Sequence, residues 1–417
     1  MPLEGSCRMT LEVGIRLYRA RWGVLGAFML VAIVNQISWI TFAAITSQAA
    51  VYYGVSELAI GLLSLSFMLV YLLVSIPASW AIDTYGFRRA VGLGAVLTAV
   101  FATARGLVGP SYTLVLLAQL GIAIGQPFIL NAVTKVAGRW FGLEERATAS
   151  GLGTLSIFVG VLLGIALTPV LTASFGIASM LLIYGVAACV VAVVFFVVAR
   201  ERPPSPPGPP GEEVRALVFD GLRQMLRRPD FLRLLAVFFI GLGVFNSVTT
   251  WIEDILRPRG FGPVQAGIIG GVMVAAGIVG ALVLPALSDR RRRRTPYLVI
   301  GMAGACLGMA GLTFATGFVG VMVASLVLGF FLLGAAPVGF QYGAEATLPA
   351  PEATSNGMLL MMGQISGIAF ILAMDAFRSP ETGSMTPSLV VLTVLMGISL
   401  LLCLRLKDTA PALAATG

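Results

Sequence analysis

Long apolar runs, each of roughly 20 residues, alternate with short polar breaks along this chain. At a rise of about 1.5 Å per residue, such a run matches the thickness of the hydrocarbon core of a bilayer. Within lipid the run must be a helix, because only a helix satisfies all of its own backbone hydrogen bonds. The pattern predicts an all-α integral membrane protein with twelve transmembrane helices. The predicted ranges are 22–45, 57–81, 90–108, 112–136, 147–172, 176–199, 232–256, 264–287, 297–317, 319–342, 356–377 and 386–406.

One polar break, after the sixth run, is much longer than the others. It begins with RERPPSPPGPPG, whose prolines favour an extended, semi-rigid spacer. It continues with EEVRALVFDGLRQMLRR, in which apolar residues recur at the spacing of an amphipathic helix lying along a membrane surface. We therefore predict two six-helix halves joined by a linker. The predicted divisions are a tail at 1–21, a first half at 22–199, a linker at 200–230, a second half at 231–406 and a tail at 407–417.

The two halves repeat each other. Glycines in the second and eighth runs, aspartates in the loops that follow, and the glycines of ATASG and ATSNG all recur at one offset of 206 residues. The matched pairs are Gly61 with Gly267, Asp83 with Asp289, and Gly151 with Gly357. A constant offset between equivalent runs indicates a parallel internal duplication, which is a feature of many secondary transporters.

The distribution of charged residues indicates how the chain is oriented in the membrane. Only 11% of the residues are charged, and the mean hydropathy is +0.95. Of the 27 Lys and Arg residues, 23 fall on the side that holds both termini and 4 on the other, so both termini are predicted to be cytoplasmic. This clustering explains the net charge of +8 without nucleic-acid binding. The first run is too long for the apolar core of a signal peptide, so we expect a spanning helix. We expect a multi-pass protein of the cell (plasma or inner) membrane.

Several classes of function are excluded by what the sequence lacks. The chain has no histidine, and its four cysteines are scattered without the spacing of a disulfide framework or a metal site. It also lacks a nucleophile–base set and a phosphate-binding loop. We therefore expect no enzyme, no ATP-driven pump, no cofactor and no metal. The expected partners are a small-molecule substrate and the lipid bilayer, and we expect the protein to act as a monomer.

The loop after the second run reads DTYGFRR, residues 83–89. It resembles the cytoplasmic signature of the major facilitator superfamily, in which an Asp, a Gly and a basic pair follow helix two. The resemblance implies the fold of that superfamily, with its two six-helix halves, and a cytoplasmic gate. The alternative is that the arginines only set the topology. The candidate gate residues are Asp83, Gly86, Arg88, Arg89 and Asp289.

Longer stretches resemble the feline leukaemia virus subgroup C receptor-related family. They are SWITFAAI, YYGVSELAIGLLSLSFMLVYLLVSIPASWAIDTYGFR, GQPFILNAVTKVAGRWFG and PAPEATSNGMLLMMGQISGI. Members of that family carry choline and ethanolamine, and haem export has also been attributed to them. The resemblance implies a cation site that includes Trp39, Gln126 and Gln364. The seventh run departs from the family, because FNSVTTWIEDIL has Asn246 near the place where an aromatic residue is expected.

Polar and aromatic residues within the runs give the candidate site. An unpaired amide in hydrocarbon costs several kcal/mol, so each one needs either a protein partner or a wet cavity. We expect Asn35, Gln36 and Gln119 to join helices, and Gln126 and Gln364, each preceded by a glycine, to contact substrate. A cation held without a carboxylate would need aromatic rings. The candidate substrate-binding residues are Trp39, Tyr71, Gln126, Asn246, Trp251 and Gln364, with Phe245 as a further available ring.

Three acidic residues, Glu253, Asp254 and Asp375, lie near the outer ends of the runs. They are candidates for attracting cations to the outer mouth or for proton coupling, or they pair with Arg105, Arg257 and Arg259. An ionisable residue buried at mid-depth is the usual mark of proton coupling, and the runs show none. We therefore expect facilitated diffusion of a small neutral or cationic organic molecule. The family resemblance favours a choline- or ethanolamine-like cation, and a proton-coupled drug or metabolite efflux antiporter is the rival. A sensor or scaffold without transport is a third possibility.

Overall fold

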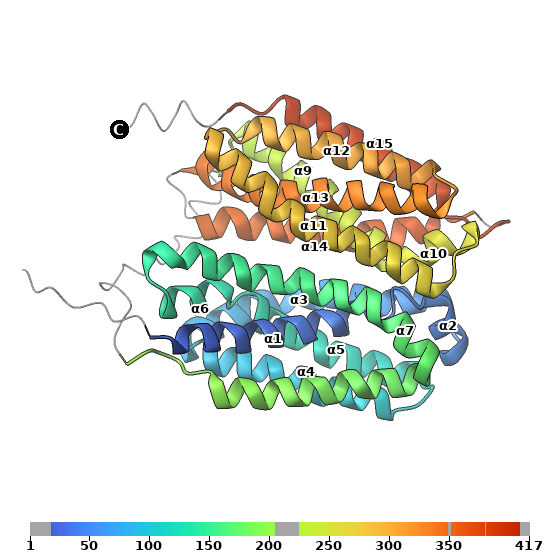
Figure 1. Cartoon of the computed structure of the whole chain (residues 1–417), viewed down its shortest axis with the longest axis horizontal. Helices are drawn as coiled ribbons and strands as arrows, with labels where there is room; N and C mark the ends of the chain where they lie inside the picture. The colour runs from blue at the N-terminus through green and yellow to red at the C-terminus, as the bar shows by residue number, and fades with distance from the viewer. Residues whose placement is uncertain (1–17, 205–224, 349–351, 380, 409–417) are drawn as a thin grey trace, which may run out of the picture.

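The computed structural model describes residues 18–204, 225–348, 352–379 and 381–408. Every regular element in these residues is a helix. Most of the linker, including the predicted amphipathic helix, lies outside the described residues. Figure 1 shows two groups of helices lying side by side, one formed by α1–α7 and the other by α9–α15. The described chain begins and finishes at the same end of the molecule, which we call the terminal end, and the opposite end is the distal end (Figure 1).

The helices follow the predicted runs closely. The first group contains α1 (Ala20–Ile40), α2 (Thr46–Tyr53), α3 (Glu57–Tyr85), α4 (Phe87–Leu107), α5 (Tyr112–Leu130), α6 (Val133–Trp140) and α7 (Leu143–Val198). The second group contains α9 (Pro229–Thr250), α10 (Ile252–Leu256), the 3-10 turn η1 (Arg257–Arg259), α11 (Pro263–Arg291), α12 (Thr295–Phe314), α13 (Phe318–Thr347), α14 (Glu352–Ala376) and α15 (Thr386–Leu404).

Within the described residues, eleven helical stretches are long and apolar enough to cross a membrane. One of them belongs to α7, which is bent at Gly176. The backbone there has φ of 78°, in the left-handed region that glycine adopts without a Cβ penalty. The bend separates the predicted fifth and sixth helices, so α7 accounts for two of the twelve predicted spans.

Two predicted runs are each divided into two elements, since the run at 112–136 breaks near Asn131 and the run at 232–256 breaks at Trp251. The helix of the run at 22–45 ends early, at Ile40, and α2 follows outside that run. The break after α1 is stabilised by hydroxyl groups, because Thr41 donates to the carbonyl of Ile37 at 2.7 Å. Hydropathy does not report these breaks, since the short second pieces remain apolar or buried.

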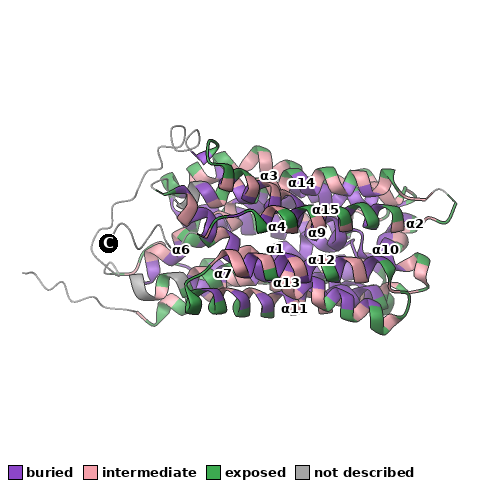
Figure 2. Ribbon diagram, turned by 90° about the horizontal axis from the view of Figure 1, so that it is seen from above, coloured by how far each residue is buried: buried purple, intermediate pink, exposed green. Residues whose placement is uncertain are grey.

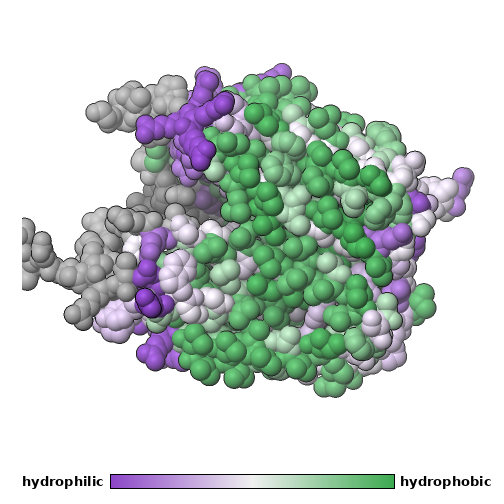
Figure 3. All heavy atoms as spheres, in the orientation of Figure 1, coloured by the Kyte–Doolittle hydropathy of each residue, from purple (hydrophilic) through white to green (hydrophobic). Residues whose placement is uncertain are grey.

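The surface of the molecule suits lipid rather than water. Large apolar side chains point outward along the helices, and Leu73 is 77% exposed and Leu307 72% exposed. Figure 3 shows that apolar residues cover the broad middle of one face, while hydrophilic residues gather at its two ends. In Figure 2 the buried residues line the inward faces of the helices. An apolar belt between two polar ends is the arrangement that a bilayer requires.

Small residues allow the helices to approach closely. A Cβ at Gly160 would lie 2.5 Å from the carbonyl oxygen of Ile33, and a Cβ at Gly164 would collide with the Ile40 side chain. Only glycine fits in these two places, which join α7 to α1. Glycines at this spacing let the backbones of two helices come close together.

Candidate functional site

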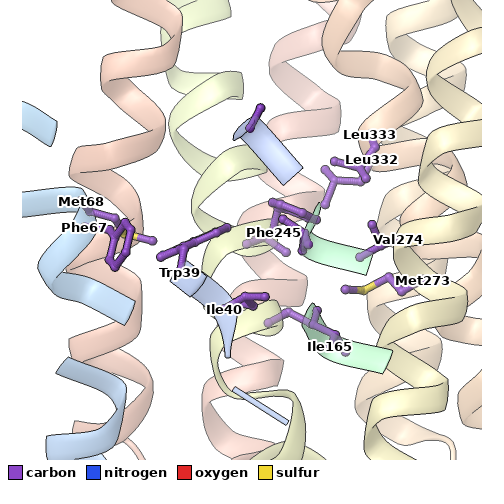
Figure 4. Close-up of a cluster of buried hydrophobic side chains, with 14 of the residues drawn as sticks. Trp39, Ile40, Phe67, Met68, Ile165, Phe245, Met273, Val274, Leu332 and Leu333 are labelled. Carbon is purple, nitrogen blue, oxygen red and sulfur yellow. The ribbon is translucent and has the colours of Figure 1, made fainter. Parts of the chain in front are cut away.

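Trp39 lies near the end of α1 and is 7% exposed. Its indole Nε1 donates to the carbonyl oxygen of Ser64 in α3 at 3.1 Å. Figure 4 shows its ring in a buried cluster with Phe67 and Met68 of α3 and Phe245 of α9. The hydrogen bond fixes the ring edge, which leaves the ring faces as the surfaces that another group could contact.

The internal repeat places a second aromatic residue opposite Trp39. Phe245 follows Trp39 by the same 206 positions that separate the other repeat pairs, so the two rings occupy equivalent places in the two halves. Phe245 also packs edge-on against Phe158 of α7, with ring centroids 6.2 Å apart. Aromatic groups from both halves therefore meet where α1, α7 and α9 come together.

The halves also meet around Gly367 in α14. A Cβ at this position would lie 2.6 Å from the sulfur of Met68 and 3.0 Å from Nδ2 of Asn246. Asn246 in α9 donates to the carbonyl oxygen of Gly363 at 3.1 Å. Asn246 therefore joins α9 to α14 and also lies against the inter-half contact, and its hydrogen-bond partner Gly363 immediately precedes Gln364.

The buried amides fall into two groups. Asn35 donates to Thr98 Oγ1 at 3.1 Å, Gln36 donates to Asn35 Oδ1 at 3.4 Å, and Gln119 accepts from Arg105 at 2.7 Å. The prediction that Asn35 and Gln119 join helices is confirmed, whereas the hydrogen bond of Gln36 stays within α1. Among the described residues, by contrast, the side chains of Gln126 and Gln364 have no hydrogen-bond partner, although Gln126 is only 5% exposed. Their amides are the ones that remain available to a bound molecule.

Two other candidate substrate-binding residues form hydrogen bonds within the protein. Tyr71 donates to Asn131 Oδ1 at 2.7 Å, and the Asn131 amide in turn donates to Ser75 and Ser79, which ties α3 to the break after α5. Trp251 is fully buried and donates to the carbonyl oxygen of Ile371 at 3.1 Å. Their roles in binding substrate stay predictions, and the structure gives each of them a structural role as well.

A ring of charges joins the halves at the distal end. Arg257 donates to Glu57 through Nη1 and to Asp254 Oδ1 through Nη2, the latter at 3.3 Å. Arg378 also contacts Glu57 through Nη1, and its Nη2 lies 2.6 Å from Asp254 Oδ1. Glu57 belongs to the first half and the other three residues to the second. Each guanidinium thus bridges the same two carboxylates across the boundary.

Glu253 adds a second connection at this end. Its two carboxylate oxygens accept from the backbone N–H and the hydroxyl of Ser47, each at 2.8 Å. Ser47 and Glu253 are themselves repeat equivalents, so α2 and α10 meet about the pseudo-symmetry axis. We call the six residues of these two paragraphs (Ser47, Glu57, Glu253, Asp254, Arg257 and Arg378) the distal lock.

Two expectations about the distal charges need correction. Of the three arginines proposed as partners of the acids, only Arg257 pairs with them. Arg259 instead donates to three carbonyl oxygens at the end of α12, and Arg105 lies inside the first half. Asp375 lines a surface hollow of about 630 Å³ together with Glu57 and Arg378, and its role at the outer mouth stays a prediction.

The candidate gate residues at the terminal end contact partners in their own halves. Asp83 pairs with Lys135 at 2.9 Å, and Asp289 pairs with Arg294. The backbone N–H of Arg88 donates to Glu201 at 2.8 Å. The other two candidates are Gly86, which has φ of 87° at the start of α4, and Arg89, which is exposed. Within the described residues these gate contacts do not cross between the halves, whereas those of the distal lock do. Their role as a gate stays a prediction for a state in which the terminal ends meet.

This geometry agrees with what sequence comparison finds. A family model described as Major Facilitator Superfamily matches residues 28–371. The chain belongs to the major facilitator superfamily. It is therefore a multi-pass membrane transporter and not an enzyme, as the sequence predicted.

Individual relatives of this transporter share about 30% of its residues. It is 30% identical to solute carrier family 49 member A3 of Xenopus tropicalis, over 88% of this chain and 79% of that protein. It is 31% identical to the choline/ethanolamine transporter FLVCR1 of Felis catus, over 87% of this chain and 69% of that protein. A crystal structure of a bacterial homologue of the lysosomal transporter Spinster superposes with a TM-score of 0.75 and 17% identity, covering 93% of this chain and 97% of that one. These comparisons confirm the superfamily fold and the resemblance drawn from the sequence.

Sequence reasoning missed a buried cation in the first half of the transporter. Arg105 falls near the end of the predicted run 90–108 and is counted among the charges outside the membrane, but it is 1% exposed. It donates to the carbonyl of Ser38 at 2.9 Å, to Gln119 at 2.7 Å and to Thr41 at 3.3 Å, and its guanidinium lies 5.4 Å from the Phe42 ring centroid. A cation at the C-terminal end of α1 stabilises the unpaired carbonyls and the helix dipole there. Arg105 therefore holds the break that follows Trp39.

Replacing Arg105 with methionine is expected to lower the free energy of unfolding by about 2–4 kcal/mol, because it leaves buried acceptors without donors. The measurement is thermal or denaturant unfolding of the purified transporter in detergent. The free energy of unfolding of Arg105→Lys should lie between those of the wild type and Arg105→Met, since lysine keeps the charge but loses the planar set of guanidinium donors. Arg89→Met is the matched control, because Arg89 is exposed and its loss should change stability by at most about 0.5 kcal/mol. Equal stability of Arg105→Met and the wild type would refute the structural role.

Proposed function

We propose that this transporter carries a choline- or ethanolamine-like cation across the membrane by facilitated diffusion. The observation that carries the proposal is the pair of partnerless amides, Gln126 in the first half and Gln364 in the second, on helices that also border the aromatic cluster around Trp39. Amide oxygens and ring faces attract a cation whose own charge needs no carboxylate. The named activity of the feline relative, a choline/ethanolamine transporter, supports the same substrate class.

Alternating access supplies the mechanism. The two bundles, residues 22–199 and 231–406, rock about the substrate, which binds between them near the middle of the membrane. With the cytoplasmic assignment of the termini that the arginine and lysine distribution favours, the distal end is the outer end. The closed distal lock then belongs to a state that faces the cytoplasm. We propose a monomer in the cell membrane as the working unit.

The test is uptake of radiolabelled choline into proteoliposomes that contain the purified transporter, with and without an imposed pH gradient. Facilitated diffusion predicts saturable uptake that is indifferent to the gradient and stops when the internal and external choline concentrations are equal. Gln126→Leu and Gln364→Leu should each raise KM by about tenfold, the value of one lost charge-assisted contact of about 1.4 kcal/mol. Gln36→Leu is the matched control, since that amide donates to its neighbour Asn35 within α1 and its loss should leave KM unchanged. Absence of choline and ethanolamine flux would refute the proposed substrate class.

A second candidate, proton-coupled efflux of a drug or metabolite, has one observation in its favour. Glu253 and Asp254 are both fully buried, and an ionisable residue in such a place is costly unless it has a function. Uptake that follows the proton gradient in the same proteoliposomes would favour this second candidate.

A further inference from the structure

The charged groups of the distal lock do not balance. It brings three carboxylates, those of Glu57, Glu253 and Asp254, within ion-pair distance of only two guanidinium groups, those of Arg257 and Arg378. Nearby charges do not restore the balance. Arg259 points to the carbonyls of α12, and Asp375 lines the adjacent hollow and adds a further negative charge. A surplus negative charge in a water-poor interface is expensive.

One oxygen shows where the surplus lies. Asp254 Oδ1 accepts from both arginines, but Oδ2 is buried and has no partner among the described residues. The carboxyl groups of Asp254 and Glu57 contact the same two guanidinium groups, those of Arg257 and Arg378, and are thereby brought close together across the half boundary. Two carboxylates cannot donate to each other, so a hydrogen bond between them requires a proton.

We propose that the distal lock binds one proton each time it closes and releases that proton to the same side when it opens. The proton is held between Asp254 of the second half and Glu57 of the first, and it neutralises the surplus charge of the closed interface. Opening separates the two carboxyl groups and returns both to water, where they ionise at neutral pH. The inference rests on alternating access but is independent of the substrate that is carried.

Among the described residues, the hollow beside the lock gives it a path to the distal side. The hollow of about 630 Å³ beside Glu57 and Arg378 opens to the distal surface. On the inner side, Trp251 packs against Gly61, one helical turn deeper in α3 than Glu57. Because the proton enters and leaves on one side, it biases the conformational equilibrium without being carried across. This distinguishes the lock from the coupling site of an antiporter.

The direction of the pH effect follows from the closed state. Burial, followed by the charges of Glu253 and Glu57, raises the pKa of Asp254 from its ordinary value of 3.8 to about 8. Protonation therefore favours the closed lock below about pH 8, and the advantage is lost as the pH rises through that value. Between the ordinary and the raised pKa of Asp254, the ratio of open to closed lock should rise by about tenfold per pH unit.

Spin labels across the distal end test the proposal. Val51 in α2 and Val264 in α11 are exposed residues of opposite halves at this end, so cysteines placed there, in a chain whose native cysteines are serine, accept labels without entering the lock. The long-distance population is measured by double electron–electron resonance in nanodiscs from about pH 5.5 to 8.5. In the wild type the fraction of molecules with the long label distance should increase with pH, and the ratio of open to closed lock should rise by about tenfold per pH unit below the raised pKa of Asp254.

Two neutral variants and one control decide the outcome. Asp254→Asn and Glu57→Gln keep the shape of the protonated group but cannot titrate, so each should flatten the pH response and keep the lock closed. Asp375→Asn, outside the ring, should retain the wild-type slope. A flat response in the wild type, or an unchanged slope in both neutral variants, would overturn the proposal. The labels need no substrate, so this result is independent of whether the transporter moves choline.

Discussion

Replacing Trp39 with alanine is expected to raise the KM for choline by about 30-fold, which equals the roughly 2 kcal/mol of a desolvated cation–π contact. The ring is buried between α1, α3 and α9, its edge is fixed by the hydrogen bond to Ser64, and its faces are the largest aromatic surface in the inter-half cluster. The measurement is initial uptake into proteoliposomes over a range of choline concentrations.

Two variants separate the ring from its hydrogen bond. Trp39→Phe keeps an aromatic face but loses the indole donor, so its KM should rise only a fewfold. Trp22→Ala removes a tryptophan that is 42% exposed and packs edge-on against Phe141 near the terminal end, so it should leave uptake unchanged. An unchanged KM in Trp39→Ala would exclude Trp39 from the site.

The bilayer explains why the fold could be predicted from the sequence. Its fixed thickness and its lack of hydrogen-bonding partners reduce each long apolar run to a spanning helix, and the repeat at one offset identifies the two halves. The elements that hydropathy misjudged are the interrupted ones. The breaks after Ile40 and at Trp251 depend on carbonyls capped by side chains and on buried contacts between α2 and α10, which a hydropathy profile does not register.

The candidate site was predictable only in part. The amides could be recognised as polar groups in lipid, but the sequence could not assign their hydrogen-bond partners. The structure shows that Asn35 and Gln119 form hydrogen bonds within the protein, whereas the side chain of Gln126 forms none among the described residues. Glu57 reads as an acidic residue in the first turn of a helix, which is favourable for the helix dipole alone. Arg378 reads as a loop charge. Their contact joins residues 321 positions apart, so no local pattern could have indicated the distal lock.

The distal closure has an apolar part as well as a charged one, and glycine is essential to it. Gly61 in α3 and its repeat equivalent Gly267 in α11 both lie on the half boundary. A Cβ at Gly267 would lie 2.8 Å from the carbonyl oxygen of Ile165, and a Cβ at Gly61 would lie 2.7 Å from Cη2 of Trp251. The repeat has kept glycine where each half must approach the other, so any side chain here opposes the closed state.

Replacing Gly61 with leucine is therefore expected to abolish transport by holding the distal end open. Trp251 cannot move aside easily, since its ring is fully buried and its Nε1 is bonded to the Ile371 carbonyl. Even Gly61→Ala should cost about 1–3 kcal/mol in the closed state, a shift of about 5- to 150-fold toward the open state. Uptake assays and the distance between labels at Val51 and Val264 measure the two consequences together.

A matched glycine and a rescue variant make this prediction specific. A Cβ added at Gly26 in α1 would meet no atom within 4 Å, so Gly26→Ala should leave both uptake and label distance at wild-type values. Trp251→Leu combined with Gly61→Ala should restore distal closure, because the smaller side chain leaves room for the added methyl group. Wild-type uptake by Gly61→Leu would show that the contact between Gly61 and Trp251 is not formed during the transport cycle. A closed label distance without uptake would instead assign the defect to substrate binding.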